Sequence, residues 1–330
     1  MPDFGEARDD AARDKEKTSA AVTSQGPALV TPEEKDELGW ENPDAMLNSE
    51  LQRLAMANRE QIYSIVQPYV ERTLGRQVEM TGISATYPYQ SVDVEYRTVD
   101  EPYVAGWEFV ALEDDGSLKS EAHIASESGV VIEYETTAGL YLMAYRDRIA
   151  EIREHITTAH PHFTQLPDGY IRAWRIADPM LKFSFYGSGP GKFDKVEAAI
   201  KAIYQAFQER PDRTDAEWRE LFESVDPGFG IHIQVKVMLR DPSVDLTEDM
   251  ARELAEDVRT NPLFAGGAAW TINTYSGLLM RDDIHFHENW MFRADPEWPD
   301  VHPEVPFPEW RIEQWVDGAT IQSFVDGDPR

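Results

Sequence analysis

The chain has 330 residues and a formal net charge of −30, from 61 acidic against 31 basic side chains. Hydrophobic residues make up 42% of it, enough for a substantial core, so wholesale disorder is excluded. A field this negative repels nucleic-acid phosphates and argues against a nucleic-acid partner. The chain contains no cysteine, so it forms no disulfide, thiolate nucleophile or cysteine-ligated metal site. No apolar run reaches the length of about 18 residues that spans a bilayer.

Residues 1–50 show no sustained hydrophobic period and are rich in charged residues, Ser, Thr, Ala, Gly and Pro. This composition is typical of flexible segments. We therefore expect a disordered acidic tether, with a short docking piece around Leu38, Gly39 and Trp40.

Residues 51–165 are expected to form a first α+β subdomain. Apolar residues recur at helical spacing from Leu51 onward, and Gly75 is expected to end this helical region. Strands follow, the clearest over residues 92–97, where apolar and charged residues alternate. Residues 130–134 are interpreted as a further strand or sheet edge, and residues 137–155 as a long helix.

Residues 166–294 are expected to form a second α+β subdomain. The sequence predicts strands at 172–176, 181–186, 231–237, 270–275 and 284–292, with helices at 194–208 and 214–222 and after Thr247. Residues 295–330 hold six prolines and three tryptophans, so we expect an extended tail that wraps the surface. The predicted fold class is α+β, an antiparallel or mixed sheet with packed helices.

One pattern suggests metal binding. Asp283, His285 and His287 alternate on a predicted strand, and alternation places all three side chains on one face. Two imidazoles and a carboxylate on one face can begin a divalent metal site. The alternative is a polar strand face without a ligand.

Other chemical signals are weak. Residues 187–192 form a glycine-rich loop between a predicted strand and a helix, which suits an anion, but Tyr186 and Phe193 stand where a phosphate loop needs glycine and Ser or Thr. His160 and His162 follow a helix end, where a capping or loop role is favoured over ligation. No nucleophile-elbow motif is present. The sequence predicts no cofactor and no catalytic residue.

The order of short motifs resembles a known family. The motifs, with the strand at residues 231–239, are Ala57-Asn58-Arg59-Glu60, Ala138-Gly139-Leu140-Tyr141 with Met143 and Tyr145, Phe185-Tyr186-Gly187, Phe193-Asp194-Lys195 and Glu209-Arg210-Pro211-Asp212. Over roughly residues 55–275 their succession resembles a family of uncharacterised Gram-positive lipoproteins of staphylococci and related bacilli. The resemblance implies a lipid-anchored, extracytoplasmic protein, and it carries over no catalytic residue.

The location depends on a segment that the sequence does not contain. A lipoprotein precursor needs a signal peptide and a lipid-bearing cysteine, and neither is present. If a signal peptide has been removed, residues 1–50 serve as a tether between the membrane and the domain. Otherwise the expected location is cytoplasmic.

Three functional interpretations remain open. The favoured one is a non-catalytic extracytoplasmic protein that binds an unknown protein or small molecule and contacts the membrane only through a lipid anchor. The second is a metal-dependent hydrolase built on His285 and His287. The third is a cytoplasmic acidic protein that sequesters a basic partner.

Overall fold

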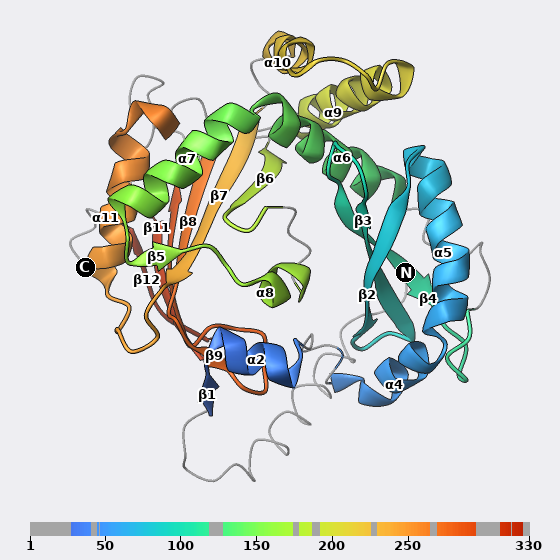
Figure 1. Cartoon of the computed structure of the whole chain (residues 1–330), viewed down its shortest axis with the longest axis horizontal. Coiled ribbons are helices and arrows are strands. Elements are labelled where there is room, and N and C mark those ends of the chain that lie inside the picture. Colours follow the sequence, from blue (N-terminus) through green and yellow to red (C-terminus); the bar gives the residue numbers. More distant parts are fainter. Residues whose placement is uncertain are drawn as a thin grey trace.

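The structure, a computed structural model, describes residues 28–40, 45, 47–118, 128–173, 178–186, 192–225, 230–264, 269–294, 311–317 and 319–325. Its class is α+β, as the sequence predicts: a three-stranded and a seven-stranded sheet flanked by helices (Figure 1). A single buried hydrophobic cluster extends through both halves, from Leu51 to Ile312. None of the described helices combines the length and apolar character needed to cross a bilayer.

The smaller sheet is an antiparallel meander with helices α4 and α5 packed against it. Buried residues Ile62, Val66 and Val70 on α5 recur at helical spacing, and Gly75 ends the helix in the left-handed conformation, as expected from its position. The elements are α4 (Ser49–Ala57), α5 (Arg59–Leu74), β2 (Val78–Thr86), β3 (Ser91–Thr98) and β4 (Ala105–Ala111).

Two consecutive helices connect the halves. Helix α6 (Ser128–Ala144) packs near the smaller sheet, and α7 (Arg146–Ala159) covers the larger one, with the break between them at Tyr145 (Figure 1). The prediction of a strand or edge at residues 130–134 is wrong, because they belong to α6. Their run of β-branched residues favours a strand locally, but the helix they form packs against strands and helices from both halves.

The larger sheet has the order β12-β11-β10-β8-β7-β5, and β6 also pairs with β7. Only the β7–β8 pairing is parallel among the described strands. Its strands are β5 (Phe163–Thr164), β6 (Leu181–Tyr186), β7 (Gly230–Leu239), β8 (Ala269–Tyr275), β10 (Glu288–Ala294), β11 (Arg311–Val316) and β12 (Ala319–Val325). Further helical elements are α9 (Lys192–Glu209), α10 (Asp215–Ser224), α11 (Glu248–Thr260) and the short η2 (Pro262–Phe264).

The N-terminal segment differs from the tether predicted for residues 1–50. Strand β1 (Leu29–Val30) pairs with β9 (Leu279–Met280), and Thr31 caps helix α2 (Pro32–Leu38). Within the docking piece predicted near Leu38, Gly39 and Trp40, Trp40 packs against Tyr170, whereas Leu38 is exposed. Residues 1–27 lie outside the described part. The capping box of Thr31 and Glu34 stabilises α2, and the buried side chain of Val30 fixes β1. The polar composition of the segment does not indicate either interaction.

Two more predictions need correction. Within the predicted strand at residues 172–176, residues 172 and 173 belong to helix α8 (Asp168–Ala173), and 174–177 lie outside the described part. Within the tail predicted at 295–330 to wrap the surface, residues 311–316 and 319–325 instead form β11 and β12, which extend the larger sheet as a hairpin, while residues 295–310, 318 and 326–330 lie outside the described part. Ile312 of β11 is buried in the core. The prediction rested on the Pro and Trp content of the tail, which does not indicate this packing. The predicted division at residue 165 falls directly after β5, which belongs to the larger sheet.

Candidate functional site

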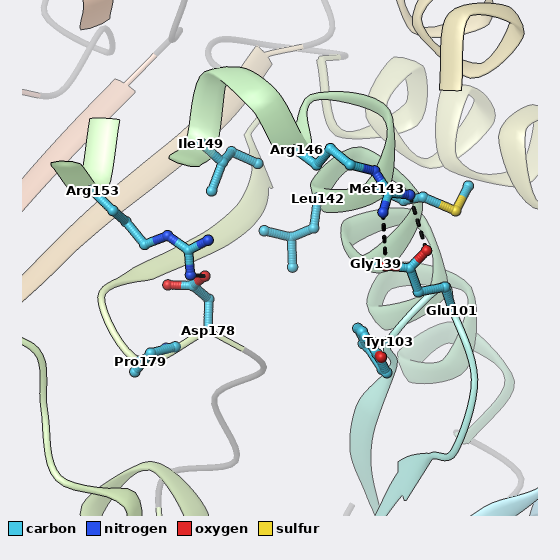
Figure 2. Close-up of a pocket in the computed structure, with 10 residues that line it drawn as sticks. All are labelled: Glu101, Tyr103, Gly139, Leu142, Met143, Arg146, Ile149, Arg153, Asp178 and Pro179. Carbon is cyan, nitrogen blue, oxygen red and sulfur yellow. Dashed lines mark hydrogen bonds and ion pairs between the residues drawn. The ribbon is translucent and has the colours of Figure 1, made fainter. Parts of the chain in front are cut away.

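A pocket of about 350 Å³ lies where α6 meets α7 (Figure 2). Its walls come from the β3–β4 turn, from both helices and from the segment that precedes β6. The lining residues are Glu101, Tyr103, Gly139, Leu142, Met143, Arg146, Ile149, Arg153, Asp178 and Pro179. This volume falls within the usual range of small-molecule sites, which favour the junctions between structural units.

Arg146, the first residue of α7, anchors one side of the pocket. Its guanidinium donates to both carboxylate oxygens of Glu101, at 3.0 and 2.9 Å, and its Nε donates to Asp215 at 2.8 Å. Hydrogen bonds to Glu101 and Asp215 raise the pKa of Arg146 above its usual value. This three-residue network joins the β3–β4 turn, the helix break and the start of α10.

Arg153 lies on the opposite side of the pocket in Figure 2 and is held by Asp178. Its Nη1 donates to Asp178 Oδ2 at 3.1 Å. The other oxygen of Asp178 accepts from the backbone N–H groups of Met180 and Leu181 at 2.9 and 2.8 Å, and only 8% of Asp178 is exposed. Asp178 is therefore fixed, whereas the other N–H groups of Arg153 have no acceptor among the described residues.

Apolar side chains fill the wall between the two ion pairs. Figure 2 shows Leu142 between the Arg146 and Arg153 groups, with Ile149 near it. Gly139 allows α6 to approach the β3–β4 turn, because a Cβ at this position would lie 2.5 Å from the carbonyl oxygen of Tyr103. The pocket therefore combines an apolar wall with the guanidinium of Arg153, whose remaining N–H groups can donate to a ligand.

The predicted metal ligands are near one another in the chain but have separate partners. Asp283, His285 and His287 lie in the turn before β10, which begins at Glu288, rather than on the predicted strand from 284. His285 Nδ1 lies 2.7 Å from Asp283 Oδ1, whereas His287 Nδ1 lies 2.8 Å from Asp317 Oδ1. Among the described residues, no group of three or more His, Asp or Glu side chains is arranged to hold a metal ion. The metal site stays a prediction, tested by the metal content of purified protein with and without both histidines.

Two other histidines meet one carboxylate. His155 Nε2 and His160 Nε2 lie 2.6 and 3.0 Å from Asp257 Oδ2, and Asn261 also contacts this group. Burial raises the pKa of Asp257, but hydrogen bonds from His160, His155 and Asn261 outweigh it and hold that pKa below its usual value. The cluster ties the end of α7 to α11, and His160 caps α7, as expected for a histidine at a helix end.

The pocket residues themselves were not predicted from the sequence. Arg146, Ile149 and Arg153 recur at helical spacing on one face of α7, which is the one local signal that was present. Glu101 and Asp178 join them only through the fold. The glycine loop at residues 187–191, a candidate anion site, lies outside the described residues.

Comparison with known proteins gave no family-model match and no match among curated proteins. Two solved structures are similar in part. A DUF1672 family protein from Staphylococcus aureus has a TM-score of 0.49 at 11% identity, covering 79% of this chain and 94% of that protein. A DUF5037 family protein from Ruminococcus gnavus has a TM-score of 0.23 at 10% identity, covering 65% of this chain and 74% of that protein. Similarity at this level assigns no function to this chain.

Proposed function

We propose that this chain is a non-catalytic binding protein that holds a small apolar acid in the pocket between α6 and α7. The observation that carries the proposal is the unused donor edge of Arg153 beside an apolar wall. A guanidinium binds a carboxylate through two parallel hydrogen bonds, and Asp178 holds this one in place. The apolar body of the ligand would contact Leu142 and Ile149.

The test uses octanoate as the probe and octanol as its neutral counterpart, with binding measured by calorimetry. We expect octanoate to bind the wild-type protein more tightly than octanol does, since only the carboxylate engages Arg153. Leu142→Trp fills the pocket and should weaken octanoate binding by about tenfold or more. Leu47→Trp, the same substitution at a position that is 59% exposed, is the matched control and should leave binding unchanged.

Arg153→Lys separates charge from geometry. Lysine retains the positive charge beside Asp178 but lacks the planar fork, so octanoate affinity should fall while the fold is retained. Equal octanoate affinity in the wild type and in Leu142→Trp would overturn the proposal, as would equal binding of octanoate and octanol.

We further propose that the protein works outside the cell membrane, tethered through its N-terminal segment. The motif succession that resembles Gram-positive lipoproteins supports this location. The test is fractionation of the native organism with intact-mass measurement of the recovered protein. A membrane-bound form with a diacylated cysteine ahead of Met1 is expected, and an unmodified soluble form that begins at Met1 would contradict the proposal.

A further inference from the structure

The three strands β6, β7 and β8 contain no Asp or Glu, although 61 of the 330 residues in the chain are acidic. Buried strands are poor in charge of either sign, so burial alone would remove lysines equally. These strands nevertheless retain Lys182, His232 and Lys236. The bias is therefore one of sign, and it makes these strands a cationic part of a strongly acidic protein.

The retained cations share one face of the sheet. Ile233, Val235 and Val237 are at most 2% exposed and belong to the main core, so the alternate residues of β7, which include Gln234 and Lys236, face the other way. Lys182 lies opposite Gln234 in the register. The backbone N–H of Lys236 donates to the carbonyl of Met180, two residues before Lys182. The two ammonium groups are thus diagonal neighbours beside one amide side chain.

His232 shows how polar groups on this face are otherwise satisfied. Its Nε2 lies 2.8 Å from Thr271 Oγ1, and its Nδ1 lies 3.2 Å from Ser184 Oγ. Lys236, half-buried, makes no ion pair with any described residue. Burial, and then the charge of Lys182, lower the pKa of Lys236 to about 8. An ammonium that is half-buried beside a second one costs stability, and this cost is relieved by a bound anion.

We infer that Lys182, Lys236 and Gln234 form a binding site for a small oxyanion, a carboxylate or a phosphate, on the face of the larger sheet opposite the main core. The site uses none of the residues that line the α6–α7 pocket. The inference therefore does not depend on the proposed function. Glu135 on α6 interacts with Lys182 and is the competing acid. When ionised, the carboxylate of Glu135 would attract Lys182 and so compete with the bound anion.

The experiment measures the thermal unfolding midpoint in sodium phosphate and in sodium succinate, each against sodium chloride at matched sodium concentration. Matched sodium is needed because a chain of charge −30 responds to cations in general. We expect a higher midpoint with phosphate or with succinate, and the probe that acts identifies the anion class. Lys236→Met and Lys182→Met should each lower the affinity for the anion by about tenfold or more, and the rise of the midpoint should become smaller accordingly.

Three controls keep the result interpretable. Lys201→Gln removes an exposed lysine of α9 that pairs with Glu197, and it should leave the anion effect intact. Lys236→Met should raise the midpoint of the free protein, which separates loss of binding from loss of folding. Glu135→Gln should strengthen anion binding. An anion effect of equal size in the wild type and in Lys236→Met, or no effect of either probe on the wild type, overturns the inference.

Discussion

Asp178 shows how one buried carboxylate can position a functional arginine. It accepts from Arg153 and from two backbone N–H groups, and the chain places it directly before β6. Removing it would leave the guanidinium and both amides without their acceptor. Its effect on stability and its effect on the pocket are therefore linked.

We predict that Asp178→Ala lowers the free energy of unfolding by about 2–3 kcal/mol, because it leaves several donors unsatisfied. Asp178→Asn keeps an acceptor oxygen for Met180 and Leu181 and should cost less. Urea unfolding of the two variants measures the difference. An Asp178→Ala protein as stable as the wild type would show that these hydrogen bonds contribute nothing net.

Glu135 gives a prediction that depends on pH. Burial raises the pKa of its carboxyl from 4.5 to about 7, against the opposing charge of Lys182. The folded-state pKa lies above the unfolded value. The contribution of Glu135 to the free energy of unfolding is therefore fully present below about pH 4.5 and is lost as the pH rises through about 7. Glu135→Gln cannot ionise, so it should be more stable than the wild type by about 3 kcal/mol near pH 8. Near pH 5 the difference should largely disappear, and a difference independent of pH would contradict this account.

At the scale of elements, the contact of α6 with the β3–β4 turn decides the shape of the pocket. Gly139 lies in the sequence motif Ala138-Gly139-Leu140-Tyr141, and the structure gives the reason for the glycine. A side chain there would collide with the carbonyl oxygen of Tyr103. The turn also carries Glu101, the partner of Arg146.

We predict that Gly139→Ala destabilises the protein by about 1–3 kcal/mol, because helix and turn must separate to admit the methyl group. The shift should also move Glu101 away from Arg146 and weaken octanoate binding. Thermal unfolding and calorimetry check the two effects. Ala138→Gly is a control on the same helix that adds no atom, and it should lose helix propensity, about 1 kcal/mol, together with the packing of one buried methyl group.

At the scale of the whole molecule, the C-terminal hairpin completes the larger sheet. Strand β11 covers the edge of β10 over six residue pairs, from Glu288↔Val316 to Arg293↔Arg311. Ile312, fully buried, packs in the main core. Without the hairpin, β10 would become an exposed edge with a row of unpaired backbone groups.

We therefore predict that truncation after Ala294 produces a protein that unfolds at lower temperature and self-associates through β10. Ile312→Ala in the full chain separates the two causes: it should lose about 2–5 kcal/mol of stability and stay monomeric, because the edge remains paired. Size-exclusion chromatography with thermal unfolding tests both. A truncated protein as stable and as monodisperse as the full chain would show that the hairpin is dispensable.

Local patterns in the sequence determined a good part of this protein. The α+β class, the helix that ends at Gly75, and the alternating strand that became β7 follow from hydrophobic period and capping chemistry, which act over a few residues. The strongly acidic character is likewise set by the sequence, since net charge is a sum over the chain. None of these features depends on distant contacts.

Only the tertiary structure decided the rest. Residues 130–134 form helix, residues 311–316 and 319–325 of the tail form a hairpin, and residues 29–30 and 32–38 form a strand and a helix, because burial against distant segments outweighs local propensity. The site arose in the same way: Glu101 meets Arg146 across 45 residues of sequence, and Arg153 meets Asp178 across 25. No local period records such pairs, because only packing brings their side chains within hydrogen-bonding distance.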